Sequence, residues 1–158
     1  GTSWNSKKMA AKLIILFSVI TASLCMDIKY KSCSTPGTAQ VTEVSIEPCT
    51  AMHYILRKGG NSQISIKFTT KNAHKTLKAK ASGKIGPFWV PFPLENADAC
   101  KAGNQGVTCP LTGNKEYAYT YSLPISTTFP SISVVVSWQL QDDSGKDVVC
   151  IQFPTKLQ

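Results

Sequence analysis

Apolar and polar residues alternate along much of the chain with a period of two. The clearest case is PSISVVVSWQLQ at residues 130–141, where every second position from Ile132 to Leu140 is apolar and the intervening positions are mainly serine or glutamine. Successive side chains of a β-strand point to opposite faces of the sheet, so this pattern is typical of a strand with one buried and one wet face. We predict an antiparallel strand here, with Trp138 on its buried face.

The same alternation recurs in shorter segments. Residues 64–68 (ISIKF) place their three large apolar side chains on one side, and residues 77–81 (LKAKA) separate apolar positions from lysines. Further strands are expected at 41–47, 116–123 and 147–153, with a short one near 27–31. Turn sequences such as KGGN and DDSGK separate these segments, and none has the period of an amphipathic helix. About seven short antiparallel strands in one domain predict an all-β, immunoglobulin-like β-sandwich of two sheets.

The N-terminal segment is read separately from the folded domain. Lysines flank Met9, and residues 13–24 (LIILFSVITASL) then carry no charge. This apolar run is too short to span a bilayer, which takes about 20 residues, but it suits a secretory signal peptide better than a buried helix. We expect residues 1–8 to be leader sequence, residues 9–25 a signal peptide, and residues 26–158 the folded domain.

Entry into the secretory route would expose the cysteines to oxidising conditions, which favours disulfides. Five of the six cysteines follow the expected signal peptide, so one is left over. They are Cys33, Cys49, Cys100, Cys109 and Cys150. No C-x-x-C pair occurs, and the two histidines, His53 and His74, are not spaced like zinc ligands, so no metal site is predicted.

Charge bears on possible partners. Loss of residues 1–25 removes three of 17 basic residues, which leaves 14 against 9 acidic ones and a net charge of +5. Six lysines lie between residues 67 and 84 without an intervening acid: Lys67, Lys71, Lys75, Lys78, Lys80 and Lys84. They are either a solvated strand face or a surface that attracts anionic lipid headgroups. Tyrosines alternate at 117–121, but no nucleic-acid recognition motif surrounds them, so no nucleic-acid binding is predicted.

The sequence contains no convincing set of catalytic residues. Asp142 and Asp143 are adjacent, and neighbouring residues on a strand point in opposite directions, so a paired catalytic role does not suit them. A following Ser-Gly pair makes a hairpin turn the better explanation. No Ser-His-Asp or Cys-His set has supporting context, and the chain is predicted not to be an enzyme.

One apolar segment needs a different explanation. WVPFPL at residues 89–94 carries four large apolar side chains, and its two prolines exclude it from helices and from the middle of a sheet. We expect a loop there, and so apolar a loop requires a cover. A lipid that occupies it part of the time would provide one.

Particular residues then resemble a known family. The segments are YKSC (30–33), SIEPC (45–49), VPFPLENADACKAG (90–103), CPL (109–111), LPI (123–125), FPSISVVVSWQLQDD (129–143) and VVCIQFP (148–154). In this order they resemble the Niemann-Pick type C2 family of secreted, sterol-binding ML domains, over essentially all of residues 27–154. The resemblance implies a sandwich whose apolar interior opens at one end to take a lipid, without a cofactor.

The resemblance also implies disulfides. Cys33 would pair with Cys150, and Cys100 with Cys109. Family members carry a further cysteine shortly after the position of Cys49, but this chain has Tyr54 there. Cys49 is therefore predicted to be unpaired, unless it pairs between chains or Tyr54 is a sequencing error.

The cavity residues follow from the same resemblance. The entrance would take Val90, Pro91 and Phe92, with Ile125, Phe129 and Pro130 on the opposing lip. The deeper wall would take Ile46, Leu56, Ile64, Leu123, Val134, Val136, Trp138 and Ile151. The pattern alone would favour an ordinary packed core for Ile64, Val134, Val136 and Trp138, and the resemblance reverses that preference for the group. Phe88 and Trp89 lie outside the motif, and would either contact a membrane or partner at the rim or pack on a neighbouring loop.

Three functions remain open at this point. The chain is expected to bind and transport a sterol or similar apolar lipid, with transient contact to an anionic membrane or a membrane sterol acceptor. The alternative is an extracellular carrier or recognition protein for fatty acids, semiochemicals or microbial glycolipids. A third possibility is a structural protein with a closed core. We expect a monomer that is secreted or resides in the lumen of endosomes and lysosomes.

Overall fold

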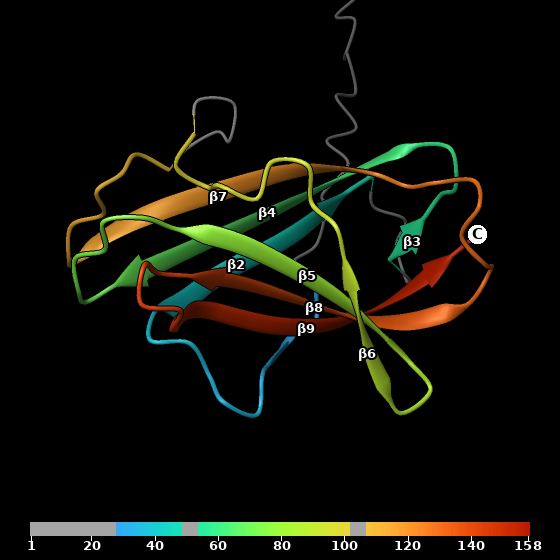
Figure 1. Cartoon of the computed structure of the whole chain (residues 1–158), viewed down its shortest axis with the longest axis horizontal. Helices are drawn as coiled ribbons and strands as arrows, with labels where there is room; N and C mark the ends of the chain where they lie inside the picture. The colour runs from blue at the N-terminus through green and yellow to red at the C-terminus, as the bar shows by residue number, and fades with distance from the viewer. Residues whose placement is uncertain (1–27, 49–53, 102–106) are drawn as a thin grey trace, which may run out of the picture.

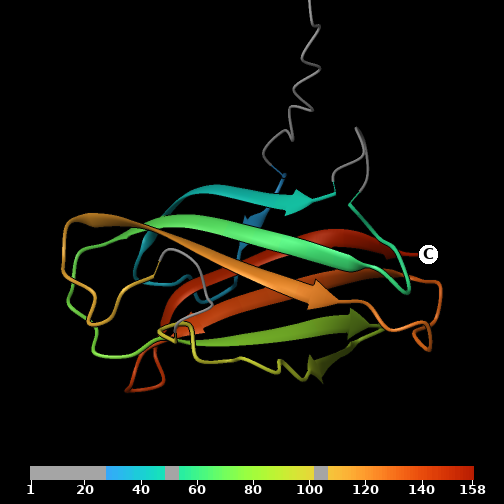
Figure 2. The ribbon, with the colours of Figure 1, turned by 90° about the horizontal axis from the view of Figure 1, so that it is seen from above.

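Two β-sheets face each other in the computed structural model, which describes residues 28–48, 54–101 and 107–158 (Figures 1 and 2). All regular elements in these ranges are strands. They are β1 (Lys31–Ser32), β2 (Gln40–Glu47), β3 (Ile55–Leu56), β4 (Asn61–Thr70), β5 (Lys78–Ile85), β6 (Phe88–Phe92), β7 (Lys115–Pro124), β8 (Ser133–Gln141) and β9 (Asp147–Leu157). The predicted all-β sandwich is confirmed, with more strands than the seven expected.

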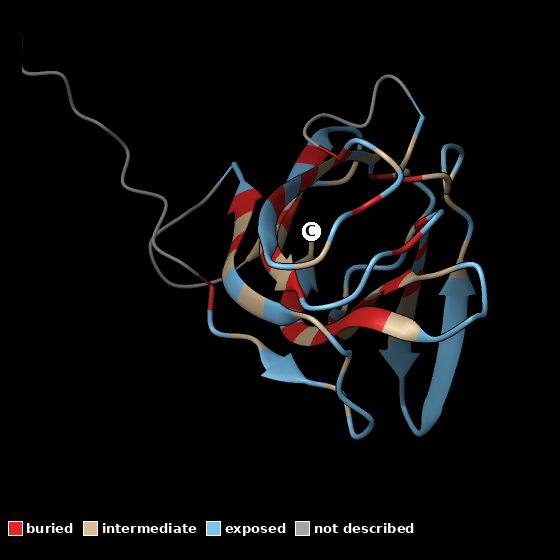
Figure 3. Cartoon of the chain, turned by 90° about the vertical axis from the view of Figure 1, so that its left-hand side faces the viewer, coloured by how far each residue is buried: buried red, intermediate tan, exposed pale blue. Residues whose placement is uncertain are grey.

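The larger sheet has the order β1-β9-β8-β5-β6, and β3 runs parallel to the end of β9. The smaller sheet has the order β2-β4-β7, and all its pairs are antiparallel. Register places Trp138 of β8 opposite Ala81 of β5 and Ile151 of β9, so the apolar alternations of three strands meet on one face. Buried positions alternate with exposed ones along the strands (Figure 3), and the buried face of each sheet looks into the core.

The apolar segment that was expected to be a loop is instead an edge strand. β6 pairs with β5 along one side only, with Pro91 opposite Ser82. Proline lacks the N–H that a residue of a central strand donates to a neighbouring strand, but an edge strand has one side on which no such bond is made. The loop expectation was therefore wrong, whereas the exclusion from the centre of a sheet was right.

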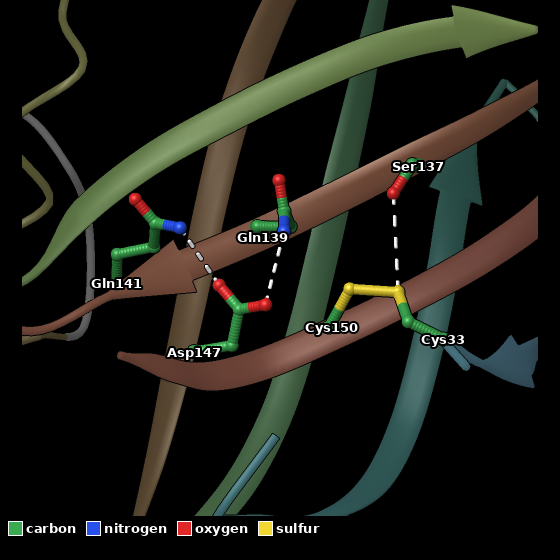
Figure 4. Close-up of a disulfide and its surroundings, with 6 residues drawn as sticks. All are labelled: Cys33, Ser137, Gln139, Gln141, Asp147 and Cys150. Atoms are coloured by element: carbon green, nitrogen blue, oxygen red, sulfur yellow. Dashed lines mark hydrogen bonds between the residues drawn. A yellow bond between two sulfur atoms is a disulfide. The ribbon is translucent and has the colours of Figure 1, made fainter. Parts of the chain in front are cut away.

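Both disulfides implied by the resemblance are present. Cys33–Cys150 ties the segment after β1 to β9 across 117 positions of sequence, and Cys100–Cys109 closes a short loop across 9. Beside the first bridge, the Asp147 carboxylate accepts hydrogen bonds from the side-chain amides of Gln139 and Gln141, which joins the ends of β8 and β9 (Figure 4).

Cys49 lies outside the described residues, so its unpaired state remains a prediction. Tyr54, which stands where the family has a cysteine, packs against the core. Its hydroxyl accepts a hydrogen bond from the backbone N–H of Lys29 at 3.1 Å. The fold therefore accommodates a tyrosine at this position, and the side chain links β3 to the first described residues.

The hairpin between β8 and β9 is shaped by Asp142, as the turn interpretation predicted. Its Oδ1 accepts hydrogen bonds from the backbone N–H of Ser144 (2.9 Å), the Ser144 hydroxyl (2.6 Å) and the backbone N–H of Lys146 (3.0 Å). Its Oδ2 lies 3.4 Å from Nδ1 of the buried His74, whose Nε2 lies 3.0 Å from the hydroxyl of Thr70 at the end of β4. These contacts join the two sheets at one end of the sandwich.

The environment of Asp142 makes stability depend on pH. The hydrogen bonds from Ser144, with that from Lys146 and the nearby imidazole of His74, hold the pKa of the Asp142 carboxyl below its ordinary value of 3.8, although partial burial opposes them. Because this pKa is lower in the folded state than in the unfolded chain, the carboxylate stabilises the fold above about pH 4. That contribution is lost as the pH falls through the folded-state pKa.

Asp142→Asn is expected to lower the free energy of unfolding by about 1 kcal/mol near neutral pH, because a charge-assisted acceptor becomes a neutral one. The difference from wild type should be smaller at about pH 2, because the native carboxyl is increasingly protonated as the pH falls toward and through its lowered pKa. Urea unfolding at the two pH values measures both effects. Asp143→Asn is the matched control, since Asp143 is exposed and should cost less than about 0.5 kcal/mol. Equal losses in the two variants would contradict the assignment.

Candidate functional site

An apolar cavity of about 380 Å³ lies where the end of β7 and the segment after it face β5, β6 and β8. No charged side chain lines it, and the polar side-chain groups of its wall residues are the Ser82 hydroxyl and the indole N–H of Trp138. Gly83 contributes to the space, because it pairs with Val136 on one side and Val90 on the other without a side chain of its own. A Cβ at Gly83 would lie 3.1 Å from a methyl carbon of Val134.

Eleven of the fourteen residues expected at the cavity line it. They are Leu56, Val90, Pro91, Phe92, Leu123, Ile125, Phe129, Pro130, Val134, Val136 and Trp138. Ile46 and Ile64 line a much smaller hollow of about 20 Å³, which shares Leu56, Leu123, Val136 and Trp138 with the cavity wall. Ile151 lines neither, and at 1% exposure it is packed core next to Trp138. The possibility of a fully closed core is wrong, because the interior contains this cavity.

Several wall residues were missed by the reasoning from sequence. They are Ala81, Ser82, Gly83, Ile85, Pro93, Ile132 and Leu157. Ile132 belongs to the same alternation as Trp138, so the pattern already contained that signal. Leu157 could not be predicted as a wall residue, because β9 continues past residue 153, where its strand was expected to end.

Aromatic rings close the cavity at its inner end. Trp138 is 1% exposed and lies between two tyrosines of β7, with ring centroids 6.3 Å from Tyr119 and 5.4 Å from Tyr121. Burial raises the pKa of the Tyr119 hydroxyl, so the phenol stays neutral at physiological pH. Tyr119 therefore adds no charge to the packing around Trp138.

A second hollow adjoins the cavity, and we call it the vestibule. Its volume is about 520 Å³, and its lining residues are Gly59, Gly60, Asn61, Phe92, Pro93, Leu94, Glu95, Tyr121, Leu123, Pro124, Ile125, Ser126 and Phe129. Phe92 and Phe129 line both hollows, and their rings meet edge to face with centroids 5.5 Å apart. This ring pair therefore forms part of the wall between a dry cavity and a vestibule that is partly polar.

The β5–β6 hairpin projects from the sandwich (Figure 1) and exposes apolar side chains. Ile85, Phe88, Trp89 and Val90 are 47%, 71%, 41% and 46% exposed. Lys84 Nζ lies 5.9 Å from the centre of the Trp89 ring. We call residues 84–90 the hairpin tip. Phe88 and Trp89 lie on β6 and are largely exposed, and the role of the two side chains stays a prediction.

The run of lysines does not form one surface. Lys67 lies on the smaller sheet and pairs with Glu43 at 2.9 Å. Lys78, Lys80 and Lys84 alternate with buried or half-buried positions on β5 and point away from the core of the larger sheet. Only this second group lies on the same sheet as the hairpin tip.

Other classes of site were considered in the described ranges. No group of three or more His, Cys, Asp or Glu side chains there is arranged to hold a metal ion. Within the same ranges, no helix has the length and apolar character needed to cross a membrane.

Known proteins place the fold and the cavity in a family. Residues 27–157 match the ML domain. NPC intracellular cholesterol transporter 2 of Danio rerio is 35% identical over 144 residues, which cover 91% of this chain and 94% of that protein. The NPC intracellular cholesterol transporter 2 homolog a of Drosophila melanogaster is 35% identical over 133 residues, which cover 83% of this chain and 88% of that protein.

Solved structures agree. A Niemann-Pick type C2 protein from the Japanese carpenter ant superposes with a TM-score of 0.77 at 25% identity, covering 83% of this chain and 100% of that chain. Chicken MD-1, solved with lipid IVa, shares the fold with a TM-score of 0.55 at 17% identity, covering 80% of this chain and 86% of its own. The chain therefore belongs to the ML domain family and, within it, to the Niemann-Pick type C2 proteins.

Proposed function

We propose that the chain is a non-enzymatic carrier that binds a sterol, or an apolar lipid of similar shape, in the cavity. The observation that carries this proposal is a hollow of about 380 Å³ whose wall has no charged side chain. Protein interiors are normally packed as densely as organic crystals, so a void of this size needs an occupant or a function. An apolar wall favours an apolar guest over water.

The expected affinity follows from the area that a guest would bury. A sterol that buries roughly 400–500 Å² of apolar surface gains on the order of 10 kcal/mol at about 25 cal/mol per Å². The loss of translational and rotational freedom on binding offsets several kcal/mol of this gain. The remaining free energy corresponds to a Kd of about 0.1–10 μM. With so few polar groups in the wall, the shape of the guest decides selectivity.

Relatives support a sterol over the alternative ligands. The similar proteins of zebrafish and fly carry the name of cholesterol transporters, and their similarity extends over most of both chains. The binding of fatty acids, semiochemicals or microbial glycolipids has no comparable support. The function is therefore best tested first with a sterol.

A displacement assay tests the function directly. A fluorescent sterol should bind one-to-one with a Kd of about 1 μM, and unlabelled cholesterol should displace it. A fluorescent fatty acid that binds while the sterol does not would establish the alternative carrier. Failure of both ligands to bind would overturn the proposal.

We also infer a monomer that passes through the secretory route. Two disulfides within the described residues support this, because such bridges persist in oxidising compartments. The expected signal peptide at 9–25 and folded domain at 26–158 fit the same route. The protein would then act outside the cell or in the lumen of endosomes and lysosomes.

The hairpin tip is the proposed point of contact with a membrane. Its exposed Phe88 and Trp89 suit insertion among lipid headgroups, and Lys84 beside them would attract an anionic surface. Changing Phe88 and Trp89 together to serine should lower binding to vesicles with anionic lipid about tenfold or more. Co-sedimentation measures this. Sterol affinity and melting temperature should stay unchanged, and Ala118→Ser, on the outer face of the smaller sheet, is the control. Undiminished vesicle binding would refute the assignment.

A further inference from the structure

The vestibule adjoins the cavity and offers a space in which the polar end of a cavity-bound lipid could lie. The polar side-chain groups of the residues in the cavity wall are the Ser82 hydroxyl and the indole N–H of Trp138, and none of these residues is charged. A polar group buried without hydrogen-bond partners costs free energy, so an amphiphile keeps its head outside the apolar cavity. The vestibule begins at the wall that Phe92, Ile125 and Phe129 share with the cavity. This step rests on the proposed function.

The lining of the vestibule includes three polar side chains, and the one charge among them is negative. Asn61 provides an amide, Ser126 a hydroxyl and Glu95 a carboxylate. No lysine, arginine or histidine lines it. Glu95 is exposed and makes no hydrogen bond or ion pair to the described residues, so its negative charge is not neutralised within the fold.

The basic residues that directly precede the vestibule residue Gly59 in sequence do not compensate the charge of Glu95. Arg57 and Lys58 precede Gly59 but do not line the vestibule. The ammonium of Lys58 instead donates a hydrogen bond to the Ser131 hydroxyl at 2.7 Å. The backbone at the glycine pair is also occupied: the Gly59 N–H donates to the Ile125 carbonyl, and the Ile125 N–H donates to the Gly60 carbonyl. No set of free N–H groups is therefore arranged there to receive an anion.

We propose that the vestibule is a head-group subsite in which Glu95 selects lipids with a neutral hydroxyl over lipids with an anionic head. A hydroxyl can donate a hydrogen bond to the carboxylate and accept one from the amide of Asn61. A carboxylate, sulfate or phosphate in the vestibule meets a like charge, and no lysine, arginine or histidine lines the vestibule to balance it. The carrier would then prefer sterol alcohols. Fatty acids and sulfated sterols would bind less tightly because of their negative charge, and not because of their shape.

The test compares two ligands that share one skeleton. Cholesterol and cholesterol sulfate compete separately against a fluorescent sterol, so the buried part of the ligand is constant and only the head changes. Wild type should bind the alcohol about tenfold more tightly than the sulfate at low salt, and the ratio should fall in about 1 M salt, where exposed charges are screened. Glu95→Gln should bring the ratio near one, and Glu95→Lys should invert it.

Controls separate this inference from the proposed function. Glu116→Gln makes the same change of charge at the far end of β7, and it should leave the ratio as in wild type. If neither sterol displaces the probe, the carrier function itself fails. If both displace it with equal affinity in wild type, or if Glu95→Gln leaves the ratio unchanged, the carrier function stands and the head-group subsite is overturned.

Discussion

Replacement of both Cys33 and Cys150 with alanine is expected to lower the free energy of unfolding by about 4–5 kcal/mol. The bridge spans 117 positions of sequence, and a cross-link over so long a loop removes much of the conformational freedom of the unfolded chain. The native state also depends on it, because β1 has two residues and pairs with β9 at two positions. Urea unfolding under non-reducing conditions measures the loss.

The second bridge is the matched control. Cys100 and Cys109 are 9 positions apart, so the same chain-entropy relation gives a loss of about 3 kcal/mol for their double alanine variant. The two losses should therefore differ by roughly 2 kcal/mol. Equal losses would mean that local packing, and not the length of the closed loop, determines what each bridge contributes.

The strands that alternate strictly could be read from the sequence because burial has the same period as the strand. β4 and β8 each turn one face to the core, and apolar residues recur on that face. The residue types therefore indicate which side chains point inward. β3 has two residues, which is too short for any pattern. β6 was missed for a different reason: Pro91 excludes a central strand, but the sequence does not indicate which strand lies at an edge.

The cavity could be predicted as a set of apolar positions but not as a shape. Val136 and Ile151 are both apolar, both inward-facing and on adjacent strands, yet Val136 borders the void and Ile151 is packed core. Which of them meets empty space depends on where the facing sheet ends, and residue type carries no information about that. The resemblance identified the set of apolar residues around the cavity. The structure then separates those that border the void from those that belong to the packed core.

The vestibule had no signal in the sequence. Asn61 begins β4, Glu95 follows β6, and Ser126 follows β7, so three segments distant in sequence supply its polar groups. None of the three is part of a recognisable motif. Their proximity arises because both sheets end near the same place, whereas His74 and Asp142 join the sheets at the opposite end. One end of the sandwich is thus held closed while the other is free to admit a guest.

Val136→Trp is expected to raise the Kd for a sterol about 50-fold or more. The side chain of Val136 borders the cavity, and a tryptophan would occupy volume that the ligand needs. Loss of roughly 100 Å² of buried ligand surface at about 25 cal/mol per Å² corresponds to about 2.5 kcal/mol, which is close to that factor. Because the added ring enters an existing void, the cost in stability should stay below the 1–3 kcal/mol that is typical of overpacked cores.

Titration with a fluorescent sterol and thermal unfolding of the same variant separate the two effects. Val135→Trp is the matched control, because Val135 neighbours Val136 on β8 but faces outward, opposite Pro154 and Lys84, and does not border the cavity. Its sterol affinity should equal that of wild type. If Val136→Trp melts at a much lower temperature yet binds sterol as tightly as before, Val136 belongs to the packed core and the ligand occupies some other place.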